Sequence, residues 1–257
     1  RTPFITNDSD IKSGYNFMSR NQFRALASIQ KKISGNLNWA AGIAYYHFST
    51  SDLDMDKFNA YKGQLTLYNL YRTSDGGNVL QLRAGLIYDS RDHDSDPTRG
   101  LNIEATLTGT PDIIDGNGYS SMGFTFIGSQ YIPVVSDKLT FTYRLGAQVK
   151  LFGDIPYYFT NNINTMFFRR MYTEALGGNA SVRGINRNGV LGDGFAWLNV
   201  EFRWRFCNFK FINQNWGLAL NPFFDAGQIL QSYRLDEQKT KATLGLYSDV
   251  RETRVSA

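Results

Sequence analysis

The chain has no long hydrophobic run. None of its 257 residues belong to an apolar stretch approaching the roughly 18 residues that a membrane-spanning helix needs, which excludes helical insertion into a bilayer. Membrane-spanning β-strands are not excluded, because such strands carry apolar side chains at every second position and their average hydropathy resembles that of a soluble protein. The aromatic content of 15% agrees with strands of this kind, since aromatic girdles lie at both membrane interfaces.

Cysteine and histidine are nearly absent. The single cysteine, Cys207, excludes an internal disulfide and a multi-cysteine metal site. His47 and His93 are the two histidines, too few for a credible Ser-His-Asp or zinc arrangement, so we expect no enzyme, no cofactor and no metal site. The net charge of +4 is spread along the chain without a basic block, which argues against a nucleic-acid partner.

What the sequence does contain is period-two alternation. Residues 139–151 place seven apolar side chains on one face and polar or charged side chains, including Arg144 and Lys150, on the other. Residues 196–206 repeat this pattern, and charged residues on their polar face indicate a wet interior instead of a dry sandwich core. The same alternation predicts further strands, giving eight in all and an all-β fold, at 21–31, 38–49, 79–89, 100–109, 119–132 and 215–228.

The connections between these strands alternate in length. Short turns are expected near 32–37, 90–99, 133–137 and 208–214, and long loops at 50–78, 110–118, 152–193 and 229–254. Short turns on one rim and long loops on the other are typical of a transmembrane antiparallel β-barrel, with the short rim periplasmic. Within the first long loop, we predict a helix for residues 61–72.

The loop at about 152–193 is far longer than a usual connection, so it is either functional or disordered. Its glycines favour defined tight turns: Gly177, Gly178, Gly184, Gly192 and Gly194. One motif within it is a glycine-flanked arginine, formed by Val182, Arg183, Gly184 and Ile185.

Two other motifs accompany this arginine. The first is the turn sequence DSRDHDSDPTRG, and its key residues are Asp89, Arg91, Asp92, Pro97 and Gly100. The alternate aspartates of this turn resemble a calcium loop, but Pro97 stands where glycine is needed, so an ordinary solvated turn is preferred. The second is the pair of strand segments VEFR at 200–203 and FFDAG at 223–227.

With these three motifs the chain resembles the BamA/TamA family of outer-membrane barrels, also called bacterial surface antigen proteins. Ile185 departs from the family pattern, which has an aromatic residue there. Within the family, the sequence most resembles variants from Bacteroidetes-type bacteria, whose barrels often lack the periplasmic POTRA repeats.

The resemblance implies a barrel of sixteen strands, of which residues 1–257 would form a portion of a single domain. The eight strands here would be the sixth to the thirteenth, so we expect further sequence beyond both ends. The family's long loop folds into the lumen, where its arginine pairs with acidic residues of the next two strands. Carried over by motif, Arg183 would pair with Glu201 and Asp225, and strand alternation independently places both carboxylates on the inner face.

The resemblance also implies a location and a function. We expect the outer membrane of a Gram-negative bacterium, contact with its lipid and lipopolysaccharide, and a role in assembly, insertion or translocation of proteins there. Partners would be client outer-membrane proteins or other subunits of an outer-membrane complex. The alternative is a structural or accessory barrel without insertase activity. A passive pore and a closed eight-stranded barrel are both disfavoured, because the long loop would plug the first and would not fit inside the second.

Overall fold

The computed structural model describes one antiparallel β-sheet and parts of its connections. It covers residues 2–3, 17–18, 20–50, 76–116, 119–156, 159, 162–164, 176–179, 181–185, 190 and 192–232. The helix predicted for 61–72 lies outside the described residues. Among those residues, no helix is both long and apolar enough to cross a membrane.

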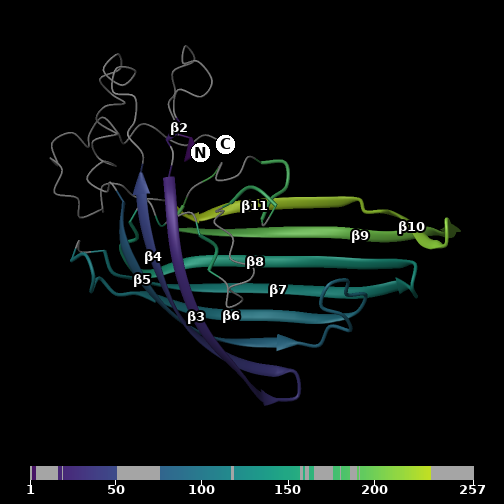
Figure 1. Ribbon diagram of the computed structural model, residues 1–257, viewed down its shortest axis with the longest axis horizontal. Coiled ribbons are helices and arrows are strands. Elements are labelled where there is room, and N and C mark those ends of the chain that lie inside the picture. The colour runs from purple at the N-terminus through teal and green to yellow at the C-terminus, as the bar shows by residue number, and fades with distance from the viewer. Residues whose placement is uncertain are drawn as a thin grey trace, which may run out of the picture.

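The sheet follows chain order, and each strand from β3 to β9 pairs antiparallel with the next. It curls strongly, so that β3 and β4 stand almost upright in Figure 1 while β7, β8 and β9 lie across the view. The strands are β3 (Arg20–Ser34), β4 (Leu37–Thr50), β5 (Gly76–Asp89), β6 (Gly100–Thr110), β7 (Ser121–Val135), β8 (Leu139–Gly153), β9 (Gly194–Phe211), β10 (Gln214–Leu220) and β11 (Phe223–Gln231), with a separate small pair, β1 (Thr2–Pro3) and β2 (Phe17–Met18).

The last predicted strand, 215–228, is interrupted. β10 and β11 both pair with β9, so together they occupy one position and the sheet has the eight strand positions expected from the alternation. The break falls at Pro222, which has no N–H to donate. One ladder bond survives there, since the Phe202 N–H donates to the Pro222 carbonyl at 3.0 Å. Strand ends also differ from prediction, most of all in β9, which continues to Phe211 instead of stopping near residue 206.

The two faces of the sheet are chemically inverted relative to a soluble protein. We call the face packed by the β8–β9 connection the inner face. On β6, every second residue points to this face, and the five from Asn102 onward are all polar and buried: Asn102, Glu104, Thr106, Thr108 and Thr110. The outer face instead exposes large apolar side chains, among them Leu86, Leu107, Leu145 and Trp204. An apolar exterior around a polar interior is the pattern of a membrane barrel.

A β-bulge at Phe206 changes the phase of β9. Leu218 pairs with Cys207 but Ala219 pairs with Arg205, so Phe206 is the extra residue. Because a one-residue shift moves every following side chain to the opposite face, the bulge keeps Phe209 on the outer side. The alternation read from the sequence ends at residue 206 for this reason.

This bulge predicts that deletion of Phe206 is tolerated. The shortened strand would form a regular ladder in which all remaining residues keep their faces. Deletion of Phe202 is the matched control, because it would turn Arg203 and Arg205 toward lipid, where charged side chains are costly. We expect the folded, heat-resistant band on gels to persist only in the first variant, and equal loss in both would contradict the assignment.

The β8–β9 connection packs on the inner face at two places. Near β4, the Phe159 ring lies 5.1 Å from Tyr46 and 6.0 Å from Phe48, edge to face. At the second place, two hydrogen bonds hold residues 162 and 164: Gln148 of β8 donates to the Asn162 carbonyl at 2.9 Å, and Gln81 of β5 donates to Asn164 at 3.1 Å. The connection therefore passes across the inner face from β8 to β4 before it returns to β9.

Candidate functional site

The glycine-flanked arginine motif is presented by a compact turn of the connection. The Gly177 N–H donates to Ser181 Oγ at 2.8 Å, and the Gly178 N–H donates to the Ile185 carbonyl at 3.1 Å. Gly184 adopts φ +92°, a left-handed conformation that other residues rarely tolerate. These constraints leave Val182 buried and aim Arg183 at the inner face of β9 and β11, whereas Ile185 remains 40% exposed.

The structure brings Arg183 together with both acidic residues singled out in the sequence. Its Nε and Nη2 donate to the two carboxylate oxygens of Asp225 at 2.8 and 2.9 Å, and its backbone N–H donates to Asp225 at 2.9 Å. Its Nη1 lies 3.0 Å from Glu201. The Asp225 side chain is only 2% exposed, so this is an enclosed, forked ion pair of the strong kind. Hydrogen bonding to Asp225, above all, raises the pKa of Arg183.

Further residues complete this arginine cluster. The Arg183 guanidinium lies 3.8 Å above the ring of Phe223, a cation–π contact. Glu201 also binds Arg203 Nε at 3.0 Å, and Asn199 donates to the Ser181 carbonyl at 2.6 Å. Sequence reasoning did not single out Phe223, Asn199 or Arg203 for this site. The available signal was their spacing of two from Glu201 or Asp225, which puts them on the same face of their strands.

An apolar contact seals the turn next to this cluster. Trp197, 2% exposed, packs with Val182 and Leu176. It stands between two glycines, because it pairs with Gly146 on β8 and with Gly227 on β11. A Cβ atom on Gly146 would lie 2.1 Å from the indole ring, and one on Gly227 would lie 2.7 Å from Leu176. Gly146 therefore leaves a recess that the indole fills, and Gly227 makes room for Leu176 and Val182 beside it.

A second ion pair holds the end of the connection where it enters β9. Lys150 Nζ lies 2.5 Å from Asp193, whose side chain is 3% exposed. Beside it, the Gln231 side-chain amide accepts from the Lys150 N–H at 2.8 Å and donates to the Lys150 carbonyl at 2.9 Å. The Gln231 side chain thus bonds the backbone of Lys150 in the way that a residue of a paired strand would. Nothing in the sequence indicated this pairing.

The turn motif between β5 and β6 is a separate, hydrogen-bonded unit. Arg91 binds Asp89 through Nε at 2.9 Å and Nη2 at 2.6 Å. Asp92 accepts from the Thr98 hydroxyl at 2.5 Å and from the N–H groups of Thr98 and Arg99. Pro97 is buried and Gly100 adopts φ +109°. Asp89 and Asp92 therefore bind the turn's own backbone and side chains.

This turn predicts a pH dependence. Hydrogen bonds, first of all from the Thr98 hydroxyl, hold the pKa of Asp92 well below its usual range. A depressed carboxyl pKa contributes stability that is present above the unfolded value of about 3.9 and lost as the pH falls through the folded value. We expect amide protection of the turn, corrected for intrinsic exchange rates, to be constant from pH 7 to about pH 5 and to fall only in stronger acid. Asp92→Asn should be less protected at neutral pH and should lose less further protection in acid than the wild type, and a wild-type loss near pH 6 would contradict this.

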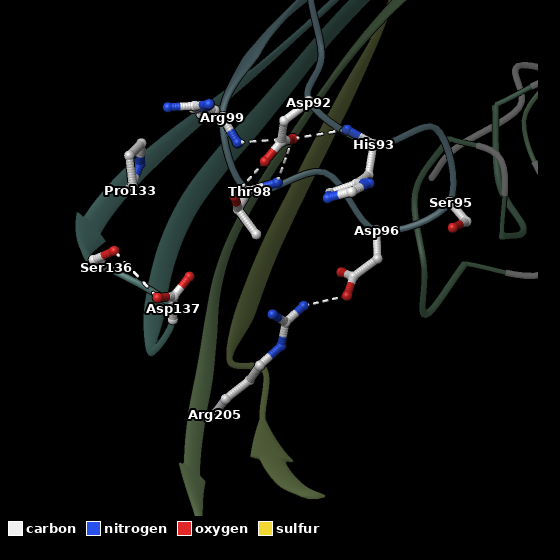
Figure 2. Close-up of a pocket in the computed structure, with 10 residues that line it drawn as sticks. All are labelled: Asp92, His93, Ser95, Asp96, Thr98, Arg99, Pro133, Ser136, Asp137 and Arg205. Carbon is white, nitrogen blue, oxygen red and sulfur yellow. Dashed lines mark hydrogen bonds and ion pairs between the residues drawn. The ribbon is translucent and has the colours of Figure 1, made fainter.

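A polar groove lies at the rim beside this turn. Figure 2 shows the turn reaching toward β9, where Asp96 forms an ion pair with Arg205. Ser136 and Asp137, from the β7–β8 turn, line the groove as well. The predicted site residues therefore fall in two places, with the arginine cluster on the inner face and the turn motif at the short-turn rim.

Comparison with known proteins places this arrangement in context. The sequence profile of the Omp85 superfamily domain matches residues 4–257. Among solved structures, the crystal structure of BamA from Haemophilus ducreyi lacking POTRA domains 1-3 is similar, with a TM-score of 0.56 and 18% identity. The match covers 87% of this chain and 44% of that one, so the chain spans less than half of that protein's length. No curated protein sequence matches. The likeness confirms the predicted fold, an antiparallel β-barrel of which these strands form a part.

Proposed function

Since this chain belongs to the Omp85 superfamily, as its motifs predicted, we propose that it forms part of an outer-membrane barrel that assists the assembly, insertion or translocation of other proteins. The membrane would be the outer membrane of a Gram-negative bacterium. Its lipid and lipopolysaccharide would cover the apolar outer face, and client outer-membrane proteins or other subunits of a complex would be its polypeptide partners.

The observation that carries this proposal is the arginine cluster on the inner face. Arg183 ties the described turn of the β8–β9 connection to β9 and β11 through Glu201 and Asp225, so this turn lies inside, against the inner face. A barrel filled in this way suits a scaffold for strand pairing better than a conducting pore. Client strands would gain from such a scaffold because unpaired backbone groups are expensive in lipid, which drives pairing with any available edge.

Depletion of the protein tests the proposal. We expect the levels of folded outer-membrane proteins to fall, and the purified protein in liposomes to accelerate the folding of a client barrel. Single-channel recordings should show no large steady conductance. Unchanged client levels together with unchanged client folding would reject the assembly role and favour a structural or accessory barrel.

A further inference from the structure

β9 and β10 form a hairpin that extends beyond the neighbouring strands. The last residue of β9 to pair with β8 is Trp204, opposite Leu139, and the Arg205 N–H then donates to the Lys138 carbonyl at 2.7 Å. Beyond the bulged Phe206, residues 207–211 pair with β10 on one side only. Figure 1 shows this hairpin reaching past the ends of β7 and β8. Within the part of the chain that the structure describes, no strand lies along the other edge of these residues.

The backbone groups facing this open edge can be identified. Ile212 and Asn213, with φ values of +47° and +57°, form a two-residue turn, so Phe211 and Gln214 make a hydrogen-bonded pair. Alternate residues of a strand point their N–H and C=O groups to opposite sides, so Phe209 also faces β10. Asn208 and Lys210 therefore present their N–H and C=O groups to the open edge.

The side chains of the hairpin are also divided between two faces. Phe209 and Phe211 pair with Trp216 and Gln214, and they share one face with Cys207 and Leu218. Asn208 and Lys210 lie on the opposite face. The aromatic face is exposed, with Phe209 42%, Phe211 56% and Trp216 48% accessible. An added strand that matched this edge would carry apolar residues at every second position.

The open edge begins where the polar groove ends. Arg205 lines the groove and immediately precedes the edge, and Ser136 and Asp137 of the β7–β8 turn line the groove beside it. Groove and edge thus form one continuous surface that extends the existing β8–β9 ladder outward. A polypeptide leaving the edge would continue into the groove, where polar side chains could form hydrogen bonds with its backbone groups.

We propose that residues 206–211 of β9 bind an extended segment of a partner polypeptide as an added strand, with its apolar side chains beside Cys207, Phe209 and Phe211. Lipid tails could cover the aromatic face, but they cannot bond the N–H and C=O groups of Asn208 and Lys210. A peptide strand satisfies both, which is the physical basis of strand addition at sheet edges. This site is distinct from the arginine cluster, and it does not depend on assembly activity.

The test uses the purified protein in nanodiscs and the only cysteine of the chain. The probe is a peptide with the sequence of residues 139–151, an alternating strand that forms the natural neighbour of β9, carrying one cysteine at successive positions. We expect disulfide formation with Cys207 to peak at every second position of the peptide. A peptide of the same composition in scrambled order should react at least tenfold less.

A matched pair of variants separates strand addition from simple proximity. Lys210→Pro removes an N–H that faces the open edge but keeps the β9–β10 ladder, because proline is tolerated on the free side of an edge strand. It should lower the disulfide yield at least tenfold, whereas Lys210→Ala, which keeps the N–H, should not. If Lys210→Pro fails to fold, Asn208→Pro tests the other donor. Equal yields at neighbouring peptide positions, as expected if lipid alone covers the face, or yields unaffected by either proline, would overturn the proposal.

Discussion

Replacing Arg183 by alanine should destabilise the folded protein by about 3 kcal/mol, at the lower end of the range for removing one partner of a buried ion pair. The cost arises because Asp225, almost fully enclosed, would lose two charged donors. The loss is not larger because the backbone N–H at position 183 remains bonded to Asp225 and Arg203 remains bonded to Glu201. Denaturant unfolding in liposomes and the temperature at which the folded band disappears on gels would measure it.

Arg203→Ala is the matched control for this effect. Arg203 also binds Glu201, but its removal leaves the forked pair between Arg183 and Asp225 intact. We expect a loss of at most about 1 kcal/mol, typical of a partly exposed pair. A double-mutant cycle of Arg183→Ala with Asp225→Ala should show strong coupling. Equal effects of the Arg183 and Arg203 replacements would mean that the arginine cluster does not hold the connection.

Replacing Trp197 by alanine should cost about 3–5 kcal/mol, the range for large aromatic residues in a packed core. The indole fills the recess over Gly146 and packs with Val182 of the turn that presents Arg183. Its loss would leave a cavity that Gly146, which has no side chain, cannot fill. We therefore expect protease to cut the β8–β9 connection faster in this variant, in parallel with the lower unfolding free energy.

Trp204→Ala is the control on the same strand. Trp204 is 48% exposed on the outer face, where lipid chains can take the place of the missing ring and no cavity forms. Its effect on the connection should be small. If both tryptophan variants lose the same stability and protection, the recess on the inner face has no special role.

The sequence predicted the faces of the strands correctly because the evidence for them is local. A strand alternates with a period of two whatever its neighbours are, so Glu201 could be assigned to the inner face from residues 196–206 alone. The same reasoning failed beyond Phe206. A bulge is set by how two paired strands fit one another, and the run FCNFKF gives no sign of which residue is unpaired.

Membership of the family was also contained in the sequence, through the motifs around Asp89, Arg183 and Asp225. The sequence paired Arg183 with its two carboxylates only by resemblance, whereas the structure supplies the distances between them. The Tyr61 to Arg72 helix stays a prediction, as do the location of the protein and its activity.

By itself, the sequence determined the all-β class, the inward polar and outward apolar faces, and the residues that make a charged cluster possible. Only the tertiary structure decided that Trp197 lies between Gly146 and Gly227, that Lys150 meets Asp193, and that the edge of β9 is open beyond Trp204. The physical reason is that these features depend on the register of strands and on the path of a long connection. Both are fixed by contacts between residues far apart in the chain, which no local pattern encodes.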